Sequence, residues 1–313
     1  MNMRAKIVFS ITVLGLLCVM SPDSLRAGSF TYSSVIVYGD SLSDNGNLYA
    51  ATGQPSAPNW NGRDSNGPVA VEQLAAMIGA PLYDFAWDGA TTGIGNHHDG
   101  GTQTSLGTHG LPGMIPELKG SAPLLASPIV PNSLFVVWGG FNDFRTGGSA
   151  TLAVTDIDSI VSSLQADGAQ HILVPGMANM GLTPAYYGNP AATAFSLEFN
   201  SLLQASLPKG AIYFNFFGLA NEFVNDPAAF GLTDVTDPCY NGVMVCSDPN
   251  QYLFWDGLHP TTAVDTYIAA DIATDIAAPP IPEPPTLLML GTFLMLGTGL
   301  AGLAGALRRR RAV

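Results

Sequence analysis

A short β-branched run near the start of the chain leads into a tight, polar, glycine-rich turn that carries a serine. The run spans residues 35–38, and the turn continues as Gly39-Asp40-Ser41-Leu42. A buried strand that ends in such a turn is typical of a parallel α/β sheet, in which sites form at the carboxyl ends of the strands. The turn can hold Ser41 Oγ clear of the sheet, although an Asp-Ser pair after a strand is often only turn chemistry.

The far end of the same region supplies an acid and a histidine. Asp256 and His259 lie three residues apart, the spacing of one helical turn, just before a helical pattern. Alone, this spacing is typical of a surface turn that starts a helix, and Pro260 at the first helical position fits that interpretation. Together with Ser41, these residues are the parts of a nucleophile that is activated by an oriented base.

Two blocks between these motifs also follow apolar, strand-like runs. Residues 85–92 contain Gly89, and residues 138–143 contain Asn142. Acyl transfer needs hydrogen-bond donors aimed at the developing oxyanion, and a backbone N–H at a glycine and an asparagine amide supply two. The sequence contains no Gly-x-Ser-x-Gly elbow, which argues against an α/β-hydrolase.

In this order, the four blocks resemble the GDSL family of the SGNH hydrolase superfamily, over roughly residues 33–277. Members of that family are esterases and lipases with a flavodoxin-like fold. The resemblance therefore implies an α/β protein of three layers, α/β/α, around a parallel sheet. It also implies a mechanism that needs no metal and no cofactor.

The resemblance, carried over residue by residue, implies a role for each site residue. Ser41 is the expected nucleophile, His259 the general base, and Asp256 the acid that orients the imidazole. The expected oxyanion hole consists of the backbone N–H groups of Ser41 and Gly89 and the side-chain amide of Asn142.

The second block departs from the family pattern at two positions. In the family its glycine often follows another glycine and the block starts with an asparagine, whereas this chain has Asp88 and Asp84 there. A carboxylate that pointed into the site would oppose the negative charge that develops in the reaction. We therefore expect Asp88 to face away from the site.

Strand-like and helical patterns alternate along the chain. Short apolar runs predict buried strands at residues 35–38, 82–85, 134–138, 172–175 and 212–214. Helical patterns cover residues 68–78, the stretch before Gly168 that contains Ile157 and Leu164, and residues 261–277. This alternation predicts a parallel sheet with helices on both faces. Residues 93–131 are rich in Gly and Ser with little periodicity, so we expect loops near the mouth of the site.

Charge and length limit the domain and its partners. Residues 28–278 are long enough for one hydrolase domain and too short for two. Between residues 28 and 282 the chain has four basic and 22 acidic residues, a net charge of −18. Such a surface disfavours nucleic acid and other polyanions as partners, and it favours a neutral substrate over an anionic one.

Both ends of the chain have the features of addressing segments. Arg4 and Lys6 precede an apolar run over residues 7–20, which predicts a secretory signal peptide at residues 1–27 that a signal peptidase removes. Residues 279–285 form a proline-rich linker with the motif Pro282-Glu283-Pro284, and residues 286–313 form an apolar segment with a final arginine cluster.

The C-terminal segments resemble the PEP-CTERM sorting signal of Gram-negative bacteria, which an exosortase-type enzyme is thought to cleave. The alternative is an ordinary membrane anchor on a proline-rich stalk. With either, we expect export to the periplasm, the cell surface or the medium, with at least transient anchoring in the inner membrane by residues 286–313.

The cysteine pattern agrees with export. After removal of residues 1–27, only Cys239 and Cys246 remain, and in an oxidising compartment such a pair is expected to form a disulfide. A redox or metal-binding role is the alternative.

Taken together, these features predict an exported serine esterase that hydrolyses carboxylic esters of small molecules, lipids or glycans through an acyl-enzyme. Two alternatives stay open. One is an acyltransferase that uses the same acyl-enzyme, and the other is a non-catalytic surface or matrix protein that binds glycans.

Overall fold

The computed structural model describes residues 31–128 and 130–277, and within them five parallel strands form one sheet. The strands are β1 (Val35–Gly39), β2 (Leu82–Asp84), β3 (Leu134–Trp138), β4 (His171–Pro175) and β5 (Ala211–Phe214). They lie in the order β2-β1-β3-β4-β5, and all neighbouring pairs are parallel. All five predicted strands are therefore confirmed.

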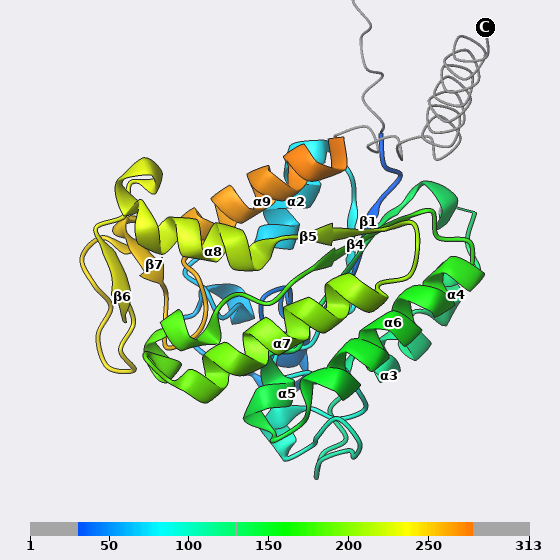
Figure 1. The fold of residues 1–313 in the computed structure, drawn as a ribbon, viewed down its shortest axis with the longest axis horizontal. Coiled ribbons are helices and arrows are strands. Elements are labelled where there is room, and N and C mark those ends of the chain that lie inside the picture. The colour runs from blue at the N-terminus through cyan, green and yellow to red at the C-terminus, as the bar shows by residue number, and fades with distance from the viewer. Residues whose placement is uncertain (1–30, 129, 278–313) are drawn as a thin grey trace, which may run out of the picture. The chain divides into compact units, whose positions relative to one another are not determined.

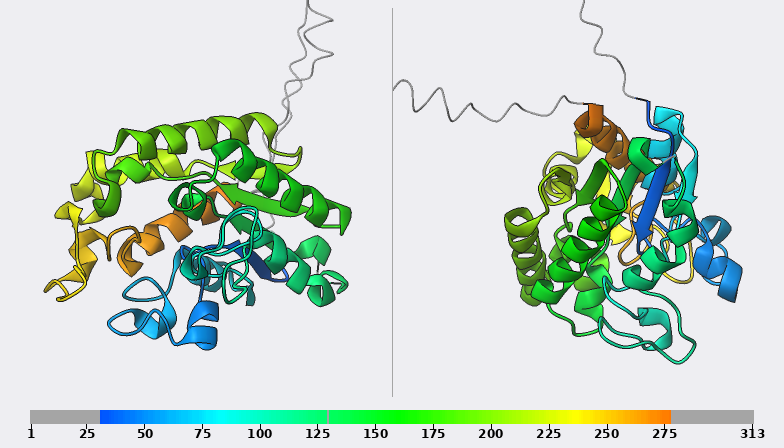
Figure 2. Two further views of the ribbon diagram at one scale, coloured as in Figure 1. Left: turned by 90° about the horizontal axis from the view of Figure 1, so that it is seen from below. Right: turned by 90° about the vertical axis from the view of Figure 1, so that its right-hand side faces the viewer.

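In the described part of the chain, helices cover both faces of the sheet (Figures 1 and 2). One face carries α2 (Ala70–Ile78), α8 (Phe216–Asn225) and α9 (Thr262–Ala277), and the other carries α3 (Met114–Gly120), α6 (Ala150–Ala166) and α7 (Pro190–Ser206). Side chains of β1 alternate between the two cores: Val35 and Val37 pack with the first group of helices, Ile36 and Tyr38 with the second. The predicted three-layer α/β/α architecture is confirmed.

The remaining described elements are short and lie around the sheet. They are the helices α1 (Asn47–Thr52), α4 (Ala122–Leu125) and α5 (Phe141–Arg145), the paired strands β6 (Asp234–Pro238) and β7 (Tyr252–Phe254), and the 3₁₀ turns Trp60–Gly62, His97–Asp99, Val130–Asn132, Met180–Leu182, Pro184–Tyr186, Pro227–Phe230 and Pro249–Gln251.

The expectation of loops throughout residues 93–131 is wrong in part, because this segment contains α3 and α4. Helix α3 is only seven residues long, too short to give the sequence a clear period. Tertiary contacts hold it in place: Met114 is fully buried, and a Glu117 carboxylate oxygen accepts the N–H of Gly39 at 2.9 Å.

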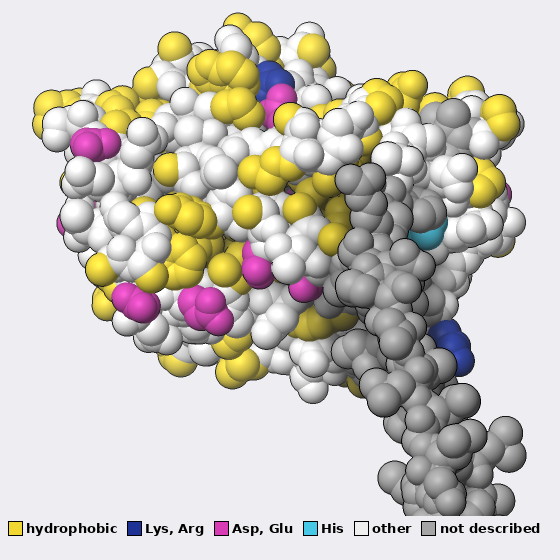
Figure 3. Space-filling model, turned by 90° about the horizontal axis from the view of Figure 1, so that it is seen from above, with side chains coloured by type: hydrophobic (Ala, Val, Ile, Leu, Met, Phe, Trp, Pro, Cys, Tyr) yellow, Lys and Arg dark blue, Asp and Glu magenta, His cyan; other side chains and the backbone are white. Residues whose placement is uncertain are grey.

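The two predicted addressing segments, residues 1–27 and 279–313, lie outside the described residues. Among the helices that are described, none combines the length and the hydropathy that a membrane span requires. On the face shown in Figure 3, acidic side chains are scattered over a largely uncharged surface and basic ones are few.

Candidate active site

Ser41 lies in a tight turn at the carboxyl end of β1. The Asp40 carbonyl accepts the N–H groups of Ser43 and Asp44, each at 2.9 Å, and Asp40 Oδ1 accepts the N–H of Leu42 at 3.1 Å. These bonds fold the backbone back on itself directly after the strand and fix the position of Ser41, which is 8% exposed. Within the described part of the chain, the N–H of Ser41 itself has no hydrogen-bond acceptor.

The structure places the side chains of Ser41, His259 and Asp256 in a continuous hydrogen-bonded series, with His259 in the middle. His259 Nε2 lies 2.7 Å from Ser41 Oγ, and His259 Nδ1 lies 2.9 Å from Asp256 Oδ2. Asp256 Oδ1 also accepts the N–H groups of Leu258 and His259, both at 2.8 Å, which fixes the loop before α9. Because Asp256 accepts a hydrogen bond from Nδ1–H, a neutral imidazole presents its unprotonated Nε2 to the Ser41 hydroxyl as an acceptor.

Asp44 ties the Ser41 turn to the second sequence block. Its Oδ2 atom accepts the N–H of Asp88 at 2.7 Å, and its Oδ1 atom accepts the N–H groups of Gly46 and Asn47. The side chain of Asn47 in turn donates to the carbonyl of Ala86 at 2.8 Å. The polar residues after Ser41 therefore position the backbone that leads to Gly89.

Gly89 occupies a position that only glycine fits. Its φ is +82°, in the left-handed region, and a Cβ at this position would collide with the side chains of Asn96 and His98. Like that of Ser41, the N–H of Gly89 has no acceptor among the described residues.

Asn142 lies in the first turn of α5, directly beyond β3, and is 2% exposed. Its Nδ2 atom donates to the carbonyl of Ala90 at 3.0 Å, so one of its two N–H groups is occupied and one is left. The neighbouring Asp143 accepts the hydroxyl of Thr92 at 2.8 Å, and burial raises the pKa of this carboxyl to about 7. These contacts hold residues 138–143 against residues 85–92.

The strand order explains why these groups meet. Strands β1 and β3 are neighbours, and the chain leaves them toward opposite edges of the sheet. This is a topological switch point, where open α/β sheets leave a crevice at the carboxyl edge. Ser41 and Asn142 follow these two strands.

The expectation that Asp88 faces away from the site is wrong. Asp88 is 5% exposed and lines a cleft of about 910 Å³ together with Asp256 and His259. Burial opposes its ionisation, but the hydrogen bond between Asp88 Oδ2 and His98 Nε2, 2.9 Å long, helps to hold the pKa of Asp88 below its usual value. Pairing with His98 therefore explains how this carboxylate is tolerated in the cleft.

Asp64 is a second acidic residue of the cleft, and sequence reasoning missed it. Its Oδ2 atom lies 3.9 Å from His259 Nε2, and its side chain is hydrogen-bonded to Asp88. Burial and repulsion from Asp88 raise the pKa of Asp64 well above its usual value. We call Asp64 and Asp88 the acidic pair.

Contacts distant in sequence hold Asp64 in place. The preceding Arg63 forms an ion pair with Glu72 of α2 at 2.6 Å, and the hydroxyl of Ser65 donates to the carbonyl of Pro260 at 3.1 Å. The segment 59–66 is irregular apart from one short turn, and it contains no motif that marks Asp64 as a site residue.

The carboxylates around His259 control its protonation. Burial lowers the pKa of this imidazole, but Asp256 and the acidic pair outweigh burial and raise the pKa of His259 to about 10. The protonated form is therefore favoured in the free site, and the neutral form that can accept a proton from Ser41 becomes more populated as pH rises.

A comparison with known families shows which family the chain belongs to. A model of the family described as GDSL-like Lipase/Acylhydrolase matches residues 35–272. The chain belongs to this family. It is a serine ester hydrolase, and the matched region includes all four blocks that carry the site.

Individual relatives are distant. The chain is 26% identical to a GDSL esterase/lipase of Arabidopsis thaliana, over 80% of this chain and 86% of the relative. It is 28% identical to the phosphatidylcholine-sterol acyltransferase of Aeromonas hydrophila, over 75% of this chain and 73% of the relative. A solved member of the lipolytic G-D-S-L family from Veillonella parvula is 14% identical and matches 78% of this chain and 97% of its own, with a TM-score of 0.46.

The disulfide that the sequence predicts is present, and it lies next to residues that line the cleft. Cys239 and Cys246 are bonded with their Cα atoms 4.8 Å apart, and residues 236–238 and 240–242 line the cleft beside Asp256 and His259. The bond therefore closes the loop that contributes residues 240–242 to the cleft.

One group of possible metal ligands occurs among the described residues. Ligand atoms of Asp64, Asp256 and His259 lie within 4.8 Å of one another. Two of these side chains are already bonded to each other, and Asp64 is bonded to Asp88.

Proposed function

We propose that this protein is an exported serine esterase that hydrolyses carboxylic esters through an acyl-enzyme. The observation that carries the proposal is the continuous chain from Ser41 Oγ to His259 Nε2, at 2.7 Å, and from His259 Nδ1 to Asp256, at 2.9 Å. A serine hydroxyl is a weak nucleophile until an adjacent base takes its proton, and the base must be held in the correct tautomer.

The reaction proceeds in two halves. Neutral His259 takes the proton of Ser41 as Oγ attacks the ester carbonyl carbon, which gives a tetrahedral oxyanion. His259 then returns the proton to the leaving alkoxide, the C–O bond breaks, and an alcohol departs from the acyl-enzyme. In the second half His259 deprotonates water, the hydroxide attacks the acyl carbon, and the proton returns to Ser41 as the carboxylic acid leaves.

The oxyanion hole of this mechanism consists of the N–H groups of Ser41 and Gly89 and the free N–H of the Asn142 amide. Its support is that the two backbone donors have no acceptor among the described residues, and that the Asn142 side chain is fixed by Ala90. Donors that are held in place before the reaction stabilise the developing charge without reorganisation.

Export and anchoring belong to the same proposal. Residues 1–27 act as the signal peptide, and residues 279–313 act as a sorting signal that holds the enzyme in the inner membrane until an exosortase-type peptidase removes the tail. The Cys239–Cys246 disulfide supports an oxidising compartment, such as the periplasm or the cell surface.

An acyltransferase is the second candidate, favoured by the similarity to the Aeromonas hydrophila phosphatidylcholine-sterol acyltransferase. Purified residues 28–278 should be assayed on p-nitrophenyl butyrate with and without alcohol acceptors. Release of butyric acid as the main product supports the esterase, and conversion of most butyryl groups into new esters at modest acceptor concentration supports the transferase. Absence of any turnover would contradict both and leave a binding protein.

A further inference from the structure

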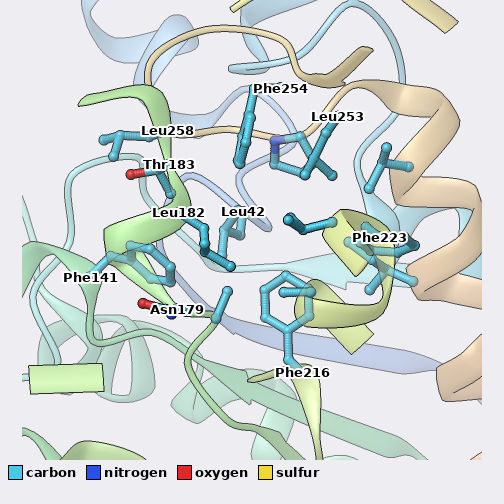
Figure 4. Close-up of a pocket in the computed structure, with 16 residues that line it drawn as sticks. Leu42, Phe141, Asn179, Leu182, Thr183, Phe216, Phe223, Leu253, Phe254 and Leu258 are labelled. Carbon is cyan, nitrogen blue, oxygen red and sulfur yellow. The ribbon is translucent and has the colours of Figure 1, made fainter. Parts of the chain in front are cut away.

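An apolar cavity lies next to the segments that carry the proposed catalytic residues, and Figure 4 shows side chains that line it. Its volume is about 40 Å³, and we call it the Leu42 cavity after the residue that follows Ser41. Phe141, which precedes Asn142, and Leu258 and Pro260, which flank His259, also line it. Neighbours of three of the proposed catalytic groups therefore form one end of the cavity.

The Leu42 cavity offers very few hydrogen-bond partners to a water molecule. Two of its lining side chains, Asn179 and Thr183, are polar, and both are already bonded elsewhere: Asn179 Oδ1 accepts the hydroxyl of Thr193 at 3.0 Å, and the Thr183 hydroxyl donates to the carbonyl of Met180 at 2.8 Å. A buried water needs two to four polar partners, so a cavity of this kind favours an apolar occupant.

Leu258 lines both the Leu42 cavity and the large cleft that contains Asp256 and His259. Its backbone is fixed by the bond from its N–H to Asp256 Oδ1, 2.8 Å long, so the residue shared by the two spaces is held in place. Leu42, the residue after Ser41, and Leu258, the residue before His259, therefore link the cavity to the segments that hold the proposed catalytic groups.

We propose that the Leu42 cavity binds the acyl chain of the ester substrate, and that this chain is short, about four to six carbons long. The proposal rests on the proposed esterase function. A volume of about 40 Å³ holds about three water-sized groups, since one such group needs roughly 10 to 15 Å³. In this proposal the carbonyl carbon and one further carbon stay outside the cavity, so that butyryl to hexanoyl are the acyl groups that fill it.

Residues of α8 and α9 at the far wall of the Leu42 cavity set the upper limit on the length of the acyl chain. Phe223 of α8 and Val264 of α9 are each 1% exposed, and both belong to the packed core between the sheet and these helices. Lengthening the chain beyond the cavity would force these side chains out of their packed positions, which close-packed interiors resist. Long acyl chains are therefore rejected, although the cleft outside is wide.

The direct test is the chain-length profile of purified residues 28–278 on p-nitrophenyl esters from acetate to dodecanoate. Each methylene that enters the cavity should raise kcat/KM about fourfold. We expect a maximum between butyrate and hexanoate, at least tenfold above acetate, and a decline at octanoate and beyond. A maximum at acetate or at decanoate and longer would overturn the proposal.

Two variants and a matched control test whether the Leu42 cavity determines the chain-length profile. Ala220→Leu places three carbons in the Leu42 cavity and should lower the hexanoate-to-acetate ratio of kcat/KM at least tenfold. Val264→Ala removes two carbons from the far wall and should move the maximum one or two carbons longer. Ala273→Leu is the control, because Ala273 packs on the same apolar core and does not line the cavity; its profile should match wild type.

Thermal unfolding of each variant establishes that it is folded before its profile is measured. If Ala220→Leu and Ala273→Leu give the same profile as wild type while all three hydrolyse acetate, the acyl site lies elsewhere and the proposed esterase stands. If wild type hydrolyses none of the esters, the esterase function itself fails. The two failures are therefore distinguishable.

Discussion

Replacing Asn142 by alanine tests the oxyanion hole. Asn142 has one amide N–H on the Ala90 carbonyl and one left for the reaction. Loss of a single oxyanion donor lowers turnover roughly 100- to 1,000-fold, or about 3 to 4 kcal/mol of transition-state stabilisation. Loss of the bond to Ala90 should lower the free energy of unfolding by only about 1 kcal/mol. The variant should therefore be folded and nearly inactive.

Steady-state kinetics on p-nitrophenyl butyrate and urea unfolding provide the measurements. Because the donor acts mainly in the transition state, kcat should fall while KM moves little. Asn200→Ala is the matched control: Asn200 is also buried, and both groups of its amide are bonded to the backbone of Met177. It should lose stability and keep its turnover. An Asn142→Ala variant with normal kcat and a raised KM would make Asn142 a substrate-binding residue and refute this assignment.

Three further predictions follow from the charges, the disulfide and the tail. The pKa of His259 is raised to about 10 and only the neutral imidazole can accept a proton, so kcat/KM should increase from pH 6 to pH 9. Asp88→Asn removes negative charge beside His259 and should move this increase to lower pH. An increase at the same pH in the variant would contradict the electrostatic account. Replacing both Cys239 and Cys246 by serine should lower the free energy of unfolding by about 2 to 3 kcal/mol in urea melts, and an unchanged midpoint would show that the bond does not constrain the unfolded chain. Deleting residues 286–313 should release active enzyme in soluble form, and mass spectrometry of mature protein from the native host should find no C-terminal arginine cluster; an intact tail would leave a plain anchor.

Much of the fold and of the candidate site could be predicted from local sequence patterns. The strands could be predicted because their β-branched residues are buried on both faces of a parallel sheet, as Val35 and Ile36 show. The blocks around Ser41 and His259 could be recognised because each is a short turn whose own side chains fix its backbone, as Asp256 does for Leu258.

Other features depend on contacts that no local pattern records. Asp64 reaches His259 only because Arg63 and Ser65 tie an irregular segment to α2 and to the loop before α9. The direction of Asp88 depends on its contact with His98, ten residues further on, and on the neighbouring Asp64. The sequence shows that these acids exist but not that they share one cleft.

The central claim is that Ser41 is the nucleophile and acts as one unit with His259. The most direct measurement is labelling of the purified domain by a fluorophosphonate probe, with peptide mapping by mass spectrometry and turnover measured for Ser41→Ala, His259→Ala and the double variant. We expect wild type to be labelled at Ser41 alone, each single variant to lose several orders of magnitude in turnover, and the double variant to be little worse than either. Labelling at another serine, or near-normal ester hydrolysis by Ser41→Ala, would contradict the account.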